Sequence, residues 1–180
     1  MEKSNIGEKI KLLTGSGMWH TREAEGLPSV HLSDGPHGLR KQEEKERQNN
    51  VSLVSTCYPT ASALACSWDV TAAERLGRAV AKEAWNADVA VLLGPGINMK
   101  RSPLCGRNFE YFSEDPFLAG RLGAAYVSAA QGENVAVSLK HFAANNQETN
   151  RQTSNSQIDE RALREIYLSA FVYVVITARP

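Results

Sequence analysis

The sequence predicts an α/β fold built on parallel strands. Three short apolar segments, two of them rich in valine, alternate with three segments whose apolar residues recur at helical spacing. Buried strands that alternate with amphipathic helices indicate parallel strands joined by right-handed crossovers. Each apolar segment runs into a polar stretch that contains glycine. Because ligands of such folds gather at the carboxyl ends of the strands, the three polar stretches should converge on one face.

The first elements along the chain are short. Residues 7–14 should form a helix that ends at Gly15. Val30 and Leu32 then alternate with polar residues before Asp-Gly-Pro, which predicts a short strand that runs into a turn. The stretch 40–50 is almost wholly polar and is interpreted as a solvated loop or a frayed helix.

A longer helix should start at the next helical pattern, and a buried strand should follow it. Thr71 and Glu74 fit a capping box, with Asp69 as the competing N-cap. The apolar stripe of this helix comprises Leu76, Val80 and Ala84. Residues 88–96 are an apolar run stopped by Gly-Pro-Gly, which is typical of a strand buried on both faces.

The third unit repeats this order. Asp115 and Pro116 should open a helix, as N-cap and first-turn proline, and Gly132 should end it. Its inner stripe comprises Leu118, Leu122, Ala125 and Ala129. Residues 135–139 form the next predicted strand, and the last helix should begin near Asp159. The apolar face of that helix comprises Leu163, Ile166, Tyr167, Ala170, Phe171 and Val174.

The composition fits one globular domain and argues against two classes of partner. Of the 180 residues 42% are apolar and 22% charged, and twenty basic side chains balance twenty acidic ones. No basic excess indicates a nucleic-acid partner. No segment approaches the ~18 apolar residues of a membrane span, so no membrane partner is expected.

The cysteines and the amino terminus indicate a reducing compartment. Cys57, Cys66 and Cys105 are odd in number and lack the spacing of a metal site, so free or buried thiols are favoured over a disulfide. The amino terminus is charged and does not resemble a secretory signal. A cytoplasmic location is therefore expected.

Five polar residues lie just beyond the predicted strands and are candidates for a ligand site: Asp34, Arg107, Lys140, His141 and Arg151. Carboxylate and guanidinium groups pair well with a vicinal diol or with each other. Taken singly, each residue has a simpler explanation: Arg107 could pair within its own loop with Glu110 or Asp115, and Lys140 could be a surface amine. Together they predict a site for a polyhydroxylated ligand.

Other ligands have weaker support. Gly-x-Gly ends the strand segment 88–96, but the third glycine of a dinucleotide fingerprint and the lysine of a phosphate loop are missing. His31, Asp34 and His37 suggest a metal, but strand positions 31 and 34 point to opposite faces. No metal is therefore expected. The polar residues 145–148 (Asn145, Asn146, Gln147 and Glu148) are expected to hold the backbone of their own loop.

Several segments, in this order, carry a family resemblance. They include "SDGPHGLR", "LLGPGINMKRSPLCGRNFEYFSEDP", "KHFAANNQETNR" and "DERALREIYLSAF". The chain resembles the amino-terminal domain of glycoside hydrolase family 3, especially its bacterial and fungal β-glucosidases, from about residue 8 to about residue 172. The resemblance implies a (β/α)8 TIM-like barrel and retaining hydrolysis of terminal non-reducing β-D-glucosyl residues without a cofactor. It also implies that Asp34, Arg107, Lys140, His141 and Arg151 bind the β-glucoside or oligosaccharide substrate.

The sequence also departs from that family. The family nucleophile is an aspartate in an Asp-Trp segment on a later strand, and its acid/base glutamate usually comes from a second domain. No Asp-Trp segment occurs here, so no catalytic residue is assigned. The resemblance makes residues 1–180 an incomplete amino-terminal part of the barrel domain, with about three of its eight strand–helix units and no second domain.

This departure bears on what the chain can do alone. The chain alone is expected to be inactive. By its resemblance it is the sugar-binding part of a family 3 hydrolase; the alternatives are a non-catalytic carbohydrate-binding remnant and an inert truncated product. If the gene is split, the missing carboxyl-terminal part would be a partner.

Overall fold

A computed structural model describes residues 6–24, 26–42 and 51–180 and contains a three-stranded parallel sheet. Its strands are β1 (Leu32–Ser33), β2 (Val91–Leu92) and β3 (Ala136–Val137), in the order β1-β2-β3. Each strand lies within or next to a predicted one, and the parallel α/β class is confirmed. Within the predicted polar stretch 40–50, residues 43–50 lie outside the described part of the chain.

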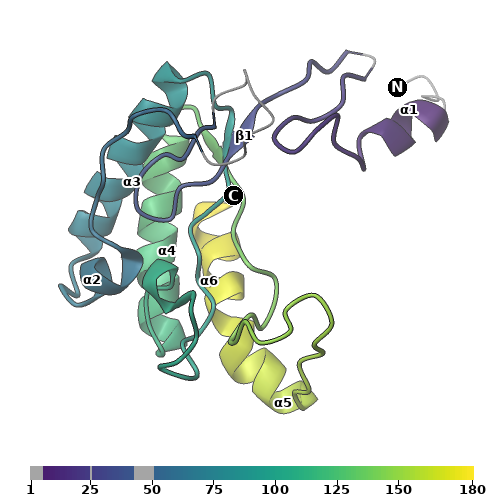
Figure 1. Cartoon of the computed structure of the whole chain (residues 1–180). Coiled ribbons are helices and arrows are strands. Elements are labelled where there is room, and N and C mark those ends of the chain that lie inside the picture. Colours follow the sequence, from purple (N-terminus) through teal and green to yellow (C-terminus); the bar gives the residue numbers. More distant parts are fainter. Residues whose placement is uncertain (1–5, 25, 43–50) are drawn as a thin grey trace.

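Three helices form a layer that packs against these strands (Figure 1). They are α3 (Val70–Asn86), α4 (Pro116–Gln131) and α6 (Ser169–Ala178), and α4 lies between the other two. One hydrophobic core joins this layer to the sheet, since Val80 of α3 and Leu122 of α4 cluster with Leu92 of β2. The order strand, helix, strand, helix, strand, helix therefore follows the predicted pattern.

Aspartates begin the long helices. The Asp115 carboxylate accepts hydrogen bonds from the backbone amides of Phe117 and Leu118, and Pro116 occupies the first turn, as predicted. Asp69 caps α3 by accepting from the Thr71 amide at 2.8 Å. The predicted Thr71–Glu74 capping box is wrong, because the Thr71 hydroxyl donates to Asp69 at 2.6 Å.

The contact between α3 and α4 is unusually close. Val80, Ala84 and Leu122 of the predicted stripes are fully buried, and Leu76 and Leu118 are half-buried. A Cβ atom on Gly77 would lie 2.4 Å from the Tyr126 backbone oxygen. Only a residue without a side chain allows the two backbones to approach this far.

The last predicted helix is divided into three pieces. Asp159 caps α5 (Glu160–Ala162), as predicted, and a π-helical turn, η2 (Leu163–Tyr167), separates it from α6. The wide turn changes the helical phase, because a π-turn inserts an extra residue. Phe171 is therefore buried, whereas Ile166 of the predicted apolar face is 40% exposed.

The shorter helices were harder to predict. Helix α1 (Ile6–Lys11) stops before the predicted end of 7–14 and buries none of its residues. Helix α2 (Ala61–Ala65), capped by Thr60, was not predicted, because five residues are too few to show a helical period.

None of the helices that the structure describes has the length and apolar character of a membrane span. All three cysteines are free thiols, as predicted.

Candidate functional site

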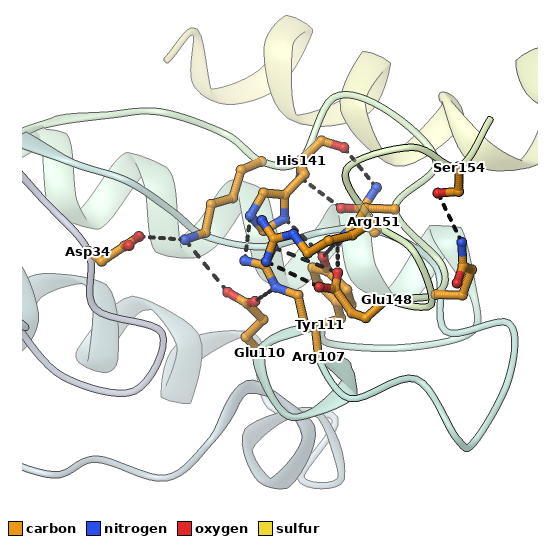
Figure 2. A network of polar contacts seen from close by, with 12 residues as sticks. Asp34, Arg107, Glu110, Tyr111, His141, Glu148, Arg151 and Ser154 are labelled. Carbon is orange, nitrogen blue, oxygen red and sulfur yellow. Dashed lines mark hydrogen bonds and ion pairs between the residues drawn. The ribbon is translucent and has the colours of Figure 1, made fainter. Parts of the chain in front are cut away.

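The polar stretches after the three strands meet in one cluster (Figure 2). The Lys140 ammonium lies 2.8 Å from a carboxylate oxygen of Asp34 and 3.6 Å from one of Glu110. Asp34 follows β1, Glu110 lies in the long loop after β2, and Lys140 follows β3. The predicted convergence of these stretches is therefore confirmed.

Backbone contacts hold the end of the third stretch in place. The Ile97 amide donates to the Lys140 carbonyl at 2.8 Å, and the Lys140 amide donates to the Pro95 carbonyl at 3.2 Å. The Asn98 side chain makes a reciprocal pair with the His141 backbone, donating at 2.9 Å and accepting at 2.7 Å. Residues 95–98 of the loop after β2 thus fix the backbone position of residues 140–141.

Glu110 is the buried anion of the cluster. Its side chain is 4% exposed, it accepts a hydrogen bond from Arg107 Nε, and it also faces Lys140. The 3₁₀ helix η1 (Asn108–Glu110) places it three residues after Arg107. The ion pair of Arg107 within its own loop is therefore real, whereas the surface-amine interpretation of Lys140 is wrong, because its side chain is only 14% exposed.

Arg107 and His141 meet across the cluster. Arg107 Nη2 lies 2.6 Å from His141 Nε2, and the Tyr111 hydroxyl lies 2.9 Å from His141 Nδ1. Because a guanidinium can only donate, Nε2 is the acceptor, so the proton resides on Nδ1 and is donated to Tyr111. Burial lowers the pKa of Arg107, but the hydrogen bond and charge of Glu110 outweigh this effect and raise it overall.

His141 is held neutral by its surroundings. Burial, followed by the positive charges of Arg107 and Lys140, lowers its pKa from 6.5 to about 4. Its partner Tyr111 is fully buried, and burial raises the pKa of Tyr111 to about 12. At neutral pH the pair is therefore an uncharged imidazole beside an uncharged phenol.

The loop residues 145–151 join the cluster through side chains. Asn145 donates to the Tyr111 hydroxyl at 2.7 Å and to Glu148 at 3.1 Å. Glu148 lies 3.9 Å from Arg107 Nη1 and 3.2 Å from Arg151 Nη1. Arg151 is 56% exposed and reaches the cluster through Glu148, so it stands at the rim. The prediction that Asn145 and Glu148 hold their own backbone is wrong, because their side chains bond other side chains.

No role was predicted for Tyr111 or Asn98 from the sequence. Glu110 was predicted only as a pairing partner of Arg107, and Asn145 and Glu148 only as residues that hold the backbone of their own loop. One signal was available for Glu110 and Tyr111, since both fall in the segment that contains Arg107. Asn98 lies two residues after Gly-Pro-Gly, close to the end of the second predicted strand, so its position was a signal as well.

The histidines that suggested a metal are arranged differently. His31 Nδ1 lies 3.0 Å from His20 Nε2, with the two rings edge to face. The Asp34 carboxylate faces Lys140 instead. Across residues 6–24, 26–42 and 51–180 the structure assembles no cluster of three or more metal-ligating side chains.

Replacing His141 with glutamine should flatten the pH dependence of folding stability. The unfolded chain binds the His141 proton more readily than the folded chain between pH 6.5 and about 4. The wild-type chain should therefore be most stable above pH 6.5 and lose about 1–2 kcal/mol from this group as the pH falls to about 4, after allowance for solvent screening. Urea unfolding at several pH values measures this slope.

The matched control is His37→Gln, a histidine outside this hydrogen-bonded cluster. Equal slopes for His141→Gln and the wild-type chain would contradict the assignment of a neutral, buried His141.

Similarity to known proteins extends along the whole chain. The family model described as "Glycosyl hydrolase family 3 N terminal domain" matches residues 36–179. The chain is 50% identical to thermostable beta-glucosidase B of Acetivibrio thermocellus over 184 aligned positions, which cover 100% of this chain and 24% of that protein. It is 47% identical over 180 positions to an exo-alpha-(1->6)-L-arabinopyranosidase of Bifidobacterium longum, with 97% and 24% covered.

The fold of this chain is also similar to that of a solved structure. The beta-glucosidase of Kluyveromyces marxianus in complex with glucose superposes with a TM-score of 0.90 at 44% identity. The match covers 99% of this chain and 21% of that chain. The chain thus spans about a quarter of the length of the proteins it matches.

Proposed function

The chain belongs to glycoside hydrolase family 3, and we propose that it forms the sugar-binding part of a β-glucosidase-type glycosidase. Residues 1–180 are the amino-terminal part of the barrel domain in this proposal. The longer protein would hydrolyse terminal non-reducing β-D-glucosyl residues with retention. Similarity to proteins named beta-glucosidase along the whole chain supports this class of substrate.

The contact between Lys140 and Asp34 is the observation that carries the proposal. An ammonium donor and a carboxylate acceptor lie 2.8 Å apart. The Lys140 side chain is 14% exposed and the Asp34 side chain 28% exposed, so both can be reached from solvent. Two neighbouring hydroxyl groups of a sugar can donate to the carboxylate and accept from the ammonium at the same time. Arg107 and His141 extend this surface, and Arg151 closes it at the rim.

These groups would hold the sugar and would not cut it. A retaining glycosidase needs two carboxyl groups ~5 Å apart, one as nucleophile and one as acid/base. Contacts to the sugar hydroxyls contribute to catalysis only as far as they strengthen in the transition state. In this proposal Asp34 binds a hydroxyl, and the nucleophile and acid/base lie outside the 180 residues.

The 180-residue polypeptide should therefore bind glucose without turning over an aryl β-glucoside. The sugar contacts come from residues that it contains, whereas it has no Asp-Trp segment to supply a nucleophile. Calorimetric titration measures binding, and release of the chromogenic aglycone measures turnover. Parallel titration with L-arabinose is informative, because one relative is named as an arabinopyranosidase.

The decisive variant is Asp34→Ala, with Glu74→Ala on the exposed side of α3 as its control. Binding should be lost in the first variant and kept in the second. Turnover well above background in the wild-type chain that disappears in Asp34→Ala would contradict the division between binding and chemistry.

A further inference from the structure

We infer that Glu110 is the positioning residue of this site, orienting the donors of Arg107 and Lys140 without touching the sugar itself. The inference rests on the proposed sugar-binding function. Nothing in the comparisons or in the sequence patterns assigns Glu110 this role.

Burial separates Glu110 from the other carboxylates of the cluster. Its side chain is 4% exposed, against 28% for Asp34 and 22% for Glu148. A ligand can therefore reach Asp34 but not Glu110. The Lys140 ammonium thus has two anionic partners, Asp34 at 2.8 Å, which a sugar hydroxyl can reach, and Glu110 at 3.6 Å, which stays a fixed counter-charge behind it.

Glu110 also fixes the orientation of the planar Arg107 guanidinium. Glu110 accepts from Nε, on one edge of the group, while Nη2 points to His141 Nε2 at 2.6 Å. Because the donors of a guanidinium are fixed in one plane, anchoring Nε also sets the direction of Nη2. Glu110 thereby also determines that His141 carries its proton on Nδ1.

The local backbone is built to present Glu110 in this position. It ends the 3₁₀ helix η1, whose first turn begins at Arg107. A Cβ atom on Gly96 would lie 2.9 Å from the Glu110 carbonyl oxygen and 2.8 Å from the Tyr111 ring. Gly96 thus lets the Glu110 segment lie directly against residues 95–98, which hold the backbone of residues 140–141.

The test compares Glu110→Gln with Glu114→Gln, an exposed glutamate on the same loop. Glutamine keeps the shape of Glu110 but removes its charge. Glu110→Gln should weaken glucose binding by about tenfold or more in calorimetry, as expected for the loss of charge-assisted contacts. In the absence of sugar, the ¹⁵N imidazole spectrum of His141 should change from one tautomer to a mixture. Glu114→Gln should change neither result.

A third variant, Glu110→Asp, separates positioning from stability. It keeps the charge and withdraws it by one methylene, so it should restore part of the single-tautomer signal. An unchanged tautomer and unchanged affinity in Glu110→Gln would overturn the inference. If neither Glu110 variant folds, Glu110 is needed for stability rather than positioning, and the inference is also overturned.

The two proposals fail in different ways. If the wild-type chain binds no glucose, the sugar-binding function fails. The tautomer comparison needs no sugar and still decides whether Glu110 positions Arg107 against His141.

Discussion

Replacing Lys140 with methionine should abolish measurable glucose binding. The change removes the donor that faces Asp34 and leaves the buried Glu110 with one counter-charge fewer. Truncating one member of a buried charge pair costs about 2–5 kcal/mol of binding free energy, which corresponds to a loss of about 30-fold or more in affinity. Methionine fills a similar volume, so the loss is attributable to the missing ammonium. Calorimetric titration with glucose measures it.

The matched control for this variant is Lys82→Met. Lys82 is an exposed lysine on α3, the helix that packs behind the sheet, and it has no contact with the cluster in the described structure. Its replacement should leave the affinity unchanged. If Lys140→Met bound glucose as tightly as the wild-type chain, the proposed pairing of Lys140 and Asp34 around a diol would be wrong.

Replacing Gly77 with alanine should destabilise the fold strongly. The new Cβ atom would lie 2.4 Å from the Tyr126 carbonyl oxygen, and at 3.0 Å from the Tyr126 carbonyl carbon and Cα. Because these are backbone atoms, the clash is relieved only by separating α3 from α4. We expect a net loss of about 3 kcal/mol, which exceeds the ~1 kcal/mol that alanine gains over glycine in a helix.

The corresponding fall in Tm is about 6–12 °C for a chain of this size. Thermal unfolding followed by circular dichroism measures it. Gly132→Ala at the end of α4 is the control, because its Cβ would meet its neighbours at an ordinary 3.4–3.5 Å. Equal melting temperatures for Gly77→Ala and Gly132→Ala would contradict the close packing of α3 on α4.

Local signals in the sequence predicted most of the fold. Asp115 and Pro116 mark a helix start through contacts within one turn, and apolar runs mark β2 and β3. The errors occurred where neighbours compete. Asp69 caps α3 in preference to Thr71, and the π-helical turn η2 interrupts a pattern that is continuous in sequence.

The candidate site was predictable only in part. Position after a strand was enough to single out Asp34 and Lys140, although 106 residues separate them. Their mutual distance, the buried Glu110 between the cations, and the link from Arg107 to His141 depend on tertiary structure. A sequence pattern carries no information on which of two carboxylates is buried and which faces a ligand.

Three segments far apart in the sequence form one sugar-binding site in this proposal. Nuclear magnetic resonance of the labelled chain during titration with glucose tests it most directly. We expect concentration-dependent shifts at Asp34, Arg107, Lys140 and His141 together, with a common dissociation constant. Shifts confined to one segment, or absent from all of them in a folded chain, would contradict it.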